Sequence, residues 1–185
     1  MKLQFDSNQS HQADAVASVV DVFDGLSTAS SQVLIDDTSL FATVANNLPL
    51  DEAALLENIR MVQERGGLQA DTELGLISEI VQTRNGESES AFPNLSVEME
   101  TGTGKTYVYN RTALELFRRH RHRKFVIVVP SIAIRSGTTK TFQVTRDHFA
   151  VEYGDIPYSF YEYDSAQPGL VRQFALSDAV EFMIM

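Results

Sequence analysis

Apolar residues near the start of the chain recur at helical spacing. Segment 12–24 carries one apolar stripe, formed by Ala13, Val16, Val20 and Phe23. Such a stripe predicts an amphipathic helix, and Gly25 is a natural stop. A second helix is expected over residues 51–65, and a third over residues 72–82.

Polar stretches separate these expected helices. The Ser- and Thr-rich residues 27–31 are typical of a loop. Residues 84–90 are polar and rich in turn formers, so they mark a boundary before the second half of the chain.

From Phe92 onward, apolar runs alternate with helical patterns, as in a parallel α/β domain. We expect, in order, a strand at 95–99, a helix at 107–119, a strand at 125–129, a turn-rich segment at 130–137, a helix to about 149, a strand at 158–163, a helix at 169–175 and a strand at 179–185. The run 125–129 is apolar on both faces, which is typical of a central parallel strand. No turn follows the last expected strand, so we expect the chain to be a fragment of a longer domain.

Between an expected strand and an expected helix lies the sequence ETGTGKT, residues 100–106. Gly102 and Gly104 let the backbone approach an anion closely, so that successive N–H groups can point at a phosphate from the start of a helix. The ammonium of Lys105 can neutralise phosphate oxygens, and the hydroxyl of Thr106 is suited to coordinate the Mg²⁺ that bridges them. The pattern predicts a nucleotide-binding loop.

The first glycine of the standard phosphate-binding pattern is replaced by Met99. Helicase-type loops usually dispense with that glycine, whereas kinase and GTPase loops usually keep it. The alternative interpretation is a Gly- and Thr-rich turn that contains an unrelated lysine.

Composition and charge narrow the class of protein. With 185 residues, 43% of them hydrophobic, the chain can form one substantial core, and the absence of Cys excludes disulfides and Cys-metal sites. The N-terminus has no apolar targeting region, and the longest aliphatic run, 125–129, has the length of a strand and not of a membrane span. We therefore expect a soluble, cytoplasmic protein without a membrane partner.

The net charge of −10 is divided unevenly along the chain. Residues 1–100 carry 4 Lys or Arg and 17 Asp or Glu, whereas residues 101–185 carry 11 and 8. The basic surplus begins at the expected phosphate loop. On charge alone, a DNA-facing surface and an ordinary solvated surface are equally consistent with it.

Three blocks of sequence resemble one protein family. Residues 96–107, SVEMETGTGKTY, resemble the first helicase motif of the Res subunits of type III restriction-modification enzymes, which are superfamily 2 helicase-like motors. Residues 124–135, KFVIVVPSIAIR, are similar to that family's next motif, and residues 171–175 to another of its stretches. Segments 5–16 and 55–67 are also similar in character, so the resemblance covers nearly the whole chain.

The resemblance implies a fold and a division of the chain. The implied fold is an α/β, RecA-like P-loop NTPase domain, a parallel sheet with flanking helices, that is incomplete and follows a mainly helical N-terminal segment. We accordingly divide the chain into an adenine-recognition segment with the first helix (1–25), an acidic helical insert (26–91) and the first part of the ATP-binding motor domain (92–185).

The resemblance also implies an activity and partners. It implies a hydrolase that uses ATP and Mg²⁺ to move or switch along double-stranded DNA. In its full form such a subunit cuts DNA in complex with a modification methyltransferase (Mod) subunit.

Site residues follow from the matched motifs. Lys105 and Thr106 are the expected catalytic residues, with Thr106 also a Mg²⁺ ligand, and the expected nucleotide-binding set is Gln12, Thr101, Gly102, Thr103, Gly104, Lys105 and Thr106. Gln12 resembles the glutamine with which such motors recognise adenine, because its amide offers both a donor and an acceptor. The alternative is a solvated Gln near a helix start.

The loop after the second strand is assigned by the resemblance to contact with the DNA backbone. Its expected DNA-binding residues are Pro130, Ser131, Arg135 and Gly137. One Arg and a few hydroxyls suit phosphates without reading sequence. The alternative is ordinary loop chemistry.

Two further features are interpreted as structural. The basic run 118–124, RRHRHRK, is interpreted as a solvated helix end, where cations complement the helix dipole, and not as a nucleic-acid patch. The Asp51-Glu52 pair imitates the acidic motif with which such motors hold Mg²⁺ and water, but it precedes the phosphate loop and is not expected to function. No metal site other than that of Mg²⁺ with ATP is expected.

These features leave three functions open. The first is the ATP-binding portion of a DNA-dependent ATPase or translocase subunit of a type III restriction endonuclease, in which this chain alone is catalytically incompetent. The second is a non-catalytic remnant that binds only nucleotide or a partner. The third is a P-loop phosphotransferase, which usually keeps the glycine that Met99 replaces.

Overall fold

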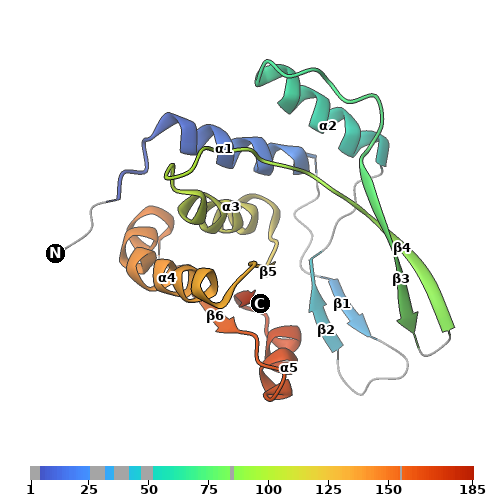
Figure 1. Ribbon diagram of the computed structural model, residues 1–185, viewed down its shortest axis with the longest axis vertical. Helices are drawn as coiled ribbons and strands as arrows, with labels where there is room; N and C mark the ends of the chain where they lie inside the picture. Colours follow the sequence, from blue (N-terminus) through green and yellow to red (C-terminus); the bar gives the residue numbers. More distant parts are fainter. Residues whose placement is uncertain (1–4, 26–31, 36–41, 47–51, 84–85, 155) are drawn as a thin grey trace.

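The computed structural model describes residues 5–25, 32–35, 42–46, 52–83, 86–154 and 156–185. A three-stranded parallel sheet, in the order β5-β7-β6, consists of β5 (Lys124–Ile127), β6 (Tyr158–Glu162) and β7 (Val180–Ile184). Three helices accompany the sheet, namely α3 (Lys105–His120), α4 (Ile132–Tyr153) and α5 (Pro168–Leu176) (Figure 1). The expected parallel α/β architecture is confirmed, and each of these elements lies close to its predicted position, except that α4 begins earlier than predicted.

One face of the sheet packs against α3 and α4. Val180, Phe182 and Ile184 on β7 are buried, and they form a core cluster with Ala113 of α3 and Phe142 of α4. Alternate residues of a strand point to opposite faces, which places these three side chains on the same face. Burying this apolar face is the main stabilising contribution of the sheet.

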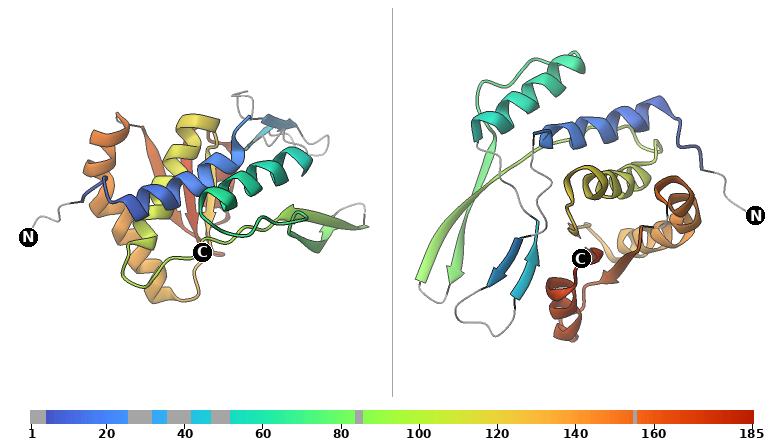
Figure 2. Two further views of the ribbon diagram at one scale, coloured as in Figure 1. Left: turned by 90° about the horizontal axis from the view of Figure 1, so that it is seen from above. Right: turned by 180° about the vertical axis from the view of Figure 1, so that it is seen from behind.

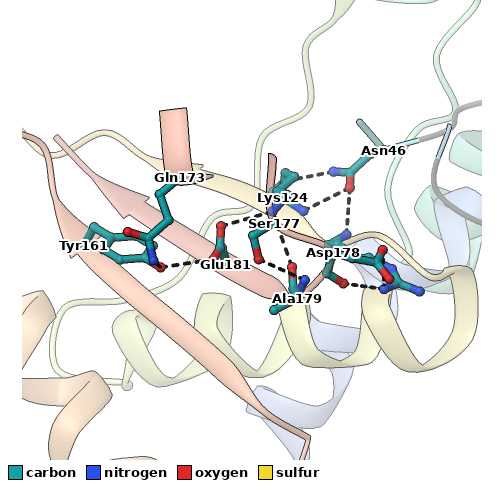
Figure 3. A network of polar contacts seen from close by, with 9 residues as sticks. Asn46, Lys124, Tyr161, Gln173, Ser177, Asp178, Ala179 and Glu181 are labelled. Carbon is teal, nitrogen blue, oxygen red and sulfur yellow. Dashed lines mark hydrogen bonds and ion pairs between the residues drawn. The ribbon is translucent and has the colours of Figure 1, made fainter. Parts of the chain in front are cut away.

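The opposite face carries a polar network under α5, with a buried ion pair at its centre (Figure 3). The ammonium of Lys124 on β5 lies 3.0 Å from a carboxylate oxygen of Glu181 on β7, and both side chains are almost fully buried. The hydroxyl of Tyr161 on β6 donates to the other carboxylate oxygen of Glu181 at 3.0 Å, and the amide of Gln173 on α5 donates to Tyr161 at 3.2 Å. The ring of Phe174 lies 5.3 Å from the Lys124 ammonium. Helix α5 is thus attached to the sheet partly through charge.

The chain begins with α1 (Ser10–Val20), followed by a 3-10 turn, η1 (Asp21–Phe23). The predicted helix over 12–24 is confirmed, although its last turn is of the tighter 3-10 type. Gly25 ends it with a φ of 85°, a conformation that favours glycine. Val16 and Val20 pack against Val108 and Leu116 of α3.

Helix α2 (Glu52–Arg65) is the predicted second helix. Its inner face packs against η1 through Leu55 and Ile59, which surround Val22. A cluster of ion pairs adds to this contact. The carboxylate of Asp21 lies 2.6 Å from a guanidinium nitrogen of Arg65 and 2.7 Å from one of Arg119 on α3. Burial opposes ionisation of this carboxyl, but the two guanidinium groups hold the pKa of Asp21 below its usual value.

Two antiparallel hairpins lie between α1 and α3, and neither was predicted. They are β1 (Gln32–Ile35) with β2 (Ala42–Ala45), and β3 (Leu76–Thr83) with β4 (Gly86–Pro93). The predicted helix at 72–82 is therefore wrong, and so is the predicted turn-rich boundary over residues 86–90. The register pairs Thr83 with Gly86 across a two-residue connection. Gly86 has a φ of 116°, a conformation that other residues rarely adopt, so a glycine is favoured at this position. The segment 26–91 is consequently not simply helical.

Four other predictions need correction or lie outside the described residues. Residues 95–99 were expected to form a strand, but this segment has no strand assignment in the structure. The turn-rich segment expected at 130–137 is mostly helix, because α4 already begins at Ile132. The loop predicted at 27–31 and the residue Asp51 lie outside the described residues.

Strand β5 is an edge strand of the described sheet, so its predicted central position is wrong. Val126 on β5 is 54% exposed, and Val128 beyond it is 76% exposed. Near the start of β5, the side chain of Asn46 takes the place of a neighbouring strand. Its oxygen accepts from the backbone N–H of Arg123 at 2.7 Å and of Lys124 at 3.0 Å, and its amide donates to the Lys124 carbonyl at 2.7 Å.

Within the part of the chain that the structure describes, no helix combines the length and the hydrophobicity that a membrane crossing requires.

The contact between α1 and α3 should make folding sensitive to pH. His120 at the end of α3 is buried, and its Nε2 lies 3.1 Å from the Val20 carbonyl. Burial holds the pKa of His120 below its ordinary value of 6.5. The folded state therefore binds this proton less readily than the unfolded state. We expect the free energy of unfolding to be maintained above pH 6.5 and to fall as the pH drops below 6.5.

Urea unfolding at pH 7.5 and pH 5.5 measures this effect. In His120→Gln, the free energy of unfolding should differ less between pH 7.5 and pH 5.5 than in the parent chain, because the group that gains a proton on unfolding is gone. His11→Gln, at an exposed position, is the control and should behave as the parent chain does. An undiminished pH difference in His120→Gln would contradict the assignment.

Candidate functional site

The predicted phosphate loop forms a tight turn directly before α3. Gly102 and Gly104 have φ values of 85° and 89°, in the region that glycine adopts without strain. Gly104 is the N-cap of α3, and Lys105 is the first helical residue. The two glycines are therefore required by the backbone conformation of the turn, as the sequence predicted.

The side chains of the loop converge on one carbonyl group. The Lys105 ammonium donates to the Glu100 carbonyl at 2.8 Å, and the hydroxyl of Thr103 donates to the same oxygen at 2.7 Å. These bonds hold the exposed Lys105 side chain across the turn. A cation is thereby positioned over the start of α3.

The start of α3 offers hydrogen-bond donors to the same space. Gly104 has no side chain with which to cap the helix, so no side-chain cap bond is formed there. The first N–H groups of a helix have no acceptors within the helix, and the helix dipole adds partial positive charge at this end. Thr106, at the second helical position, is half-buried beside Lys105. The arrangement can bind an anion with a phosphate's charge and size.

Helix α1 holds the loop from the other side. The Gln12 amide donates to the Thr103 carbonyl at 2.9 Å, and the Nε2 of His11 lies 3.4 Å from the same oxygen. Gln12 is only 7% exposed, so the alternative of a solvated Gln is excluded. A Cβ at position 104 would lie 2.6 Å from the Gln12 amide nitrogen, so a second reason for Gly104 is this close approach.

The predicted DNA-contacting residues lie around the start of α4. The hydroxyl of Ser131 accepts from the Ile134 N–H at 3.3 Å and caps the helix. Arg135 lies 3.6 Å from the carboxylate of Glu162 at the end of β6. Pro130 and Gly137 are exposed, whereas Arg135 is half-buried.

The structure places the two predicted sites on neighbouring helices that run side by side in the same direction (Figure 2). The hydroxyl of Tyr109, in the second turn of α3, lies 3.0 Å from that of Thr138 in α4. Among the described residues, the hydrogen bonds and ion pairs given for 101–106 and for 130–137 include none that joins the two loops directly. The residues within each loop are brought together, and the packed helices α3 and α4 connect the two loops.

The basic run 118–124 is largely occupied by contacts within the chain. Arg119 pairs with Asp21 and Asp24 of the first segment, at 2.7 and 2.6 Å. Further along, Arg123 pairs with Asp178, and Lys124 with Glu181. Much of this charge therefore holds elements together, and His120 and His122 are buried, so the predicted solvated helix end is only partly correct.

Sequence reasoning missed two participants in the loop. His11 was not considered, although its position beside Gln12 was an available signal. The Glu100 carbonyl gave no signal, because a backbone acceptor is the same in every residue.

Comparison with known proteins agrees with this geometry. The family model described as "Type III restriction enzyme, res subunit" matches residues 9–158, which include the phosphate loop and both sites. The EcoPI Res subunit of Escherichia phage P1, a type III restriction-modification enzyme subunit, is 32% identical over 151 residues. That match covers 80% of this chain and 14% of the relative.

Two further relatives carry the same description. The EcoP15I Res subunit of Escherichia coli is 29% identical over 150 residues, again 80% of this chain and 14% of the relative. The StyLTI Res subunit of Salmonella typhimurium is 48% identical over 62 residues, 32% of this chain and 6% of the relative. The chain spans about 14% of the length of the first two relatives. With the family model matching residues 9–158 of 185, the chain belongs to the family of type III restriction enzyme Res subunits.

Proposed function

We propose that this chain is the ATP-binding portion of a DNA-dependent ATPase or translocase subunit of a type III restriction endonuclease. The observation that carries the proposal is the position of Lys105, held across a turn with two positive-φ glycines at the start of α3. Family membership supports the same function, because its relatives are named as subunits of restriction-modification enzymes.

The residues present fit ATP with Mg²⁺. Lys105 would hold the β and γ phosphates, the amides of 102–106 would cradle them, and the hydroxyl of Thr106 would contribute to Mg²⁺ binding. Bound ATP would supply the phosphoryl group whose transfer to water drives movement. Lys105 and Thr106 are thus the proposed catalytic residues of this chain, and Thr101 to Gly104 its proposed phosphate-binding residues.

Gln12 is proposed to select adenine and to link base recognition to the phosphate loop. Its amide nitrogen already bonds Thr103, so a change in its contact with a base would reach the loop through one hydrogen bond. An amide can present both a donor and an acceptor, which matches the edge of adenine.

The DNA contact is proposed for Pro130, Ser131, Arg135 and Gly137. Arg135 is the cation of this set, and its interaction with Glu162 would compete with a DNA phosphate. DNA phosphate contacts at this loop would fix position and carry no sequence information. Cleavage of DNA and assembly with a Mod subunit are proposed for the whole protein.

Lys105→Ala should abolish nucleotide binding and leave the fold intact, because the exposed lysine contributes charge to the loop and little packing. A titration with a fluorescent ATP analogue in the presence of Mg²⁺ measures this. Lys140→Ala, which removes an exposed lysine from α4, is the matched control and should bind as the parent does. Equal affinity of Lys105→Ala and the parent would exclude the phosphate-loop assignment.

Gln12→Ala should reduce the preference for ATP over GTP by about 1–2 kcal/mol, the scale of a lost buried hydrogen-bonding group. The loss of the bond to Thr103 weakens binding of both nucleotides, so the ratio of the two affinities isolates the base contact. Competition titrations with ATP and GTP give that ratio, and Gln9→Ala at an exposed position is the control. An unchanged ratio in Gln12→Ala would return this residue to a purely structural role.

The 185-residue chain by itself should bind ATP without rapid hydrolysis. Phosphoryl transfer depends on groups that orient water and neutralise developing charge, and the Asp-Glu pair in this sequence, Asp51-Glu52, precedes the phosphate loop. Phosphate release is measured with Mg²⁺-ATP, with and without duplex DNA, and Lys105→Ala controls for contaminating ATPase. Turnover of about 1 s⁻¹ or faster that requires Lys105 would show that the catalytic carboxylate lies within these residues.

A further inference from the structure

The residues that lead into α1 are attached to the first two turns of α3. We call residues 5–9, drawn in dark blue before α1 in Figure 1, the N-terminal strap. The guanidinium of Arg111 on α3 donates to the Ser7 carbonyl at 2.8 Å. The ring of Phe5 stacks on the ring of Tyr107, with the centroids 6.0 Å apart and the planes inclined by 6°. Tyr107 directly follows Thr106, so the N-terminal strap is attached close to the phosphate loop.

Arg111 uses each of its side-chain nitrogen atoms for a different partner. Its Nη1 makes the bond to Ser7, its Nη2 lies 2.6 Å from a carboxylate oxygen of Glu152 on α4, and its Nε donates to the Tyr153 hydroxyl at 3.3 Å. The side chains of Arg111 and Glu152 are only 14% and 19% exposed, so little water competes for these bonds. A planar guanidinium with fixed donor directions suits several acceptors at once.

The N-terminal strap depends on such attachments because it has no regular structure of its own. Residues 5–9 belong to neither a helix nor a strand. Within it, the backbone N–H of Asn8 donates to the carboxylate of Asp6 at 2.9 Å, which is a local turn and does not join the segment to the rest of the fold. An ion pair between α3 and α4 would require only Arg111 and Glu152. The additional bond to Ser7 is what connects that pair to the N-terminal strap.

The N-terminal strap leads directly to Gln12. Gln9, its last residue, is the N-cap of α1 and makes no side-chain cap bond. The Gln9 carbonyl accepts from the backbone N–H of Gln12 at 3.1 Å and of Ala13 at 3.0 Å. A shift of the N-terminal strap would therefore move the backbone of Gln12, whose side chain bonds the Thr103 carbonyl of the phosphate loop.

We propose that Arg111 is a positioning residue for base selection. By holding the N-terminal strap, Arg111 fixes the start of α1 and with it Gln12, and so supports a preference for ATP over nucleotides with another base. The proposal rests on the proposed function, in which Gln12 selects adenine. A residue that acts through Gln12 can change this preference by no more than Gln12 itself contributes, roughly 5–30-fold for one buried hydrogen-bonding group.

Competition against the fluorescent ATP analogue tests this, with ATP, GTP and inorganic tripolyphosphate as the competitors. Arg111→Met keeps an unbranched side chain and removes every donor. It should lower the ratio of ATP affinity to GTP affinity by about 3-fold or more. The affinity for tripolyphosphate, which has no base, should stay within about 2-fold of the parent. Hydrogen exchange of residues 5–12, measured without nucleotide, should become faster.

Two further variants guard against a loss of folding. Arg111→Met leaves the Glu152 carboxylate without its cation, which can destabilise the chain, so the double variant Arg111→Met, Glu152→Gln removes both charges. Phe5→Ala loosens the N-terminal strap at its other attachment and leaves the ion pair in place. Both should lower the ratio in the same direction, with circular dichroism unchanged. Arg118→Met, which removes an arginine 57% exposed on the same helix, is the matched control and should keep the parent ratio.

A double-mutant cycle with Gln12→Ala tests whether Arg111 acts through Gln12. If it does, Arg111→Met should leave the ratio unchanged in the Gln12→Ala background. A further fall of the ratio in that background would overturn the proposal, because Arg111 would then act independently of Gln12.

The same titrations separate this proposal from the proposed function. An ATP preference that Gln12→Ala removes but the Arg111 and Phe5 variants keep would overturn the role of Arg111 alone. An equal loss of affinity for ATP, GTP and tripolyphosphate would also overturn it, because Arg111 would then support the phosphate loop and not base selection. A parent chain that binds tripolyphosphate without preferring ATP would overturn adenine selection by Gln12 and this proposal together, and would leave the phosphate loop in place.

Discussion

Burial of α3 on several sides is the constraint on which the rest of the structure depends. Its residues contribute to three apolar clusters: with α1 through Val108 and Leu116, with the sheet through Ala113, and with the second half of α4 through Tyr107 and Leu114. A helix buried in this way needs partners for the polar groups at its ends. At the C-terminal end, the N–H of Arg121 donates to the Phe117 carbonyl at 2.9 Å, and the side chains of His120 and Arg119 contact the Val20 carbonyl and Asp21. At the N-terminal end, the first amides face the phosphate loop.

This packing explains why residues 100–106, although rich in glycine, adopt one defined loop conformation. Residues 100–106 contain two glycines and little apolar surface, yet they are fixed at both ends. Helix α3 follows immediately, and Gln12 of α1 holds the Thr103 carbonyl. Because α1 and α3 are packed together through Val16 and Val20, the position of Gln12 relative to the loop is determined by apolar contacts some distance from it. In this chain, the phosphate loop is therefore positioned through the packing of α1 against α3.

Features set by local sequence could be predicted, and features set by distant partners could not. Helices α1, α2 and α3 were predicted because their apolar stripes and stops are local, and the loop before α3 because its glycines and lysine are adjacent. The strand expected at 95–99 has the right composition, but a strand exists only where another strand pairs with it. The pattern of 76–83 fits a helix or a strand, and the pairing with 86–93 decides between them.

The same distinction applies to the site. The residue types of the loop were sufficient to predict its chemistry. The burial of Gln12 and the pairing of Arg135 with Glu162 depend on contacts over 91 and 27 positions, which no local pattern encodes.

The buried pair of Lys124 and Glu181 limits how this sequence can change during evolution. Removing one partner would leave an unpaired charge in the core, at a cost of about 3–5 kcal/mol, whereas replacing both by well-packed apolar residues can be neutral. A single substitution at either position is thus selected against, although the double substitution is permitted. Substitutions at the two positions are expected to occur together. Tyr161 donates a hydrogen bond to Glu181, so a change at position 181 also removes the acceptor of Tyr161. Positions 124, 161 and 181 should therefore covary among related sequences.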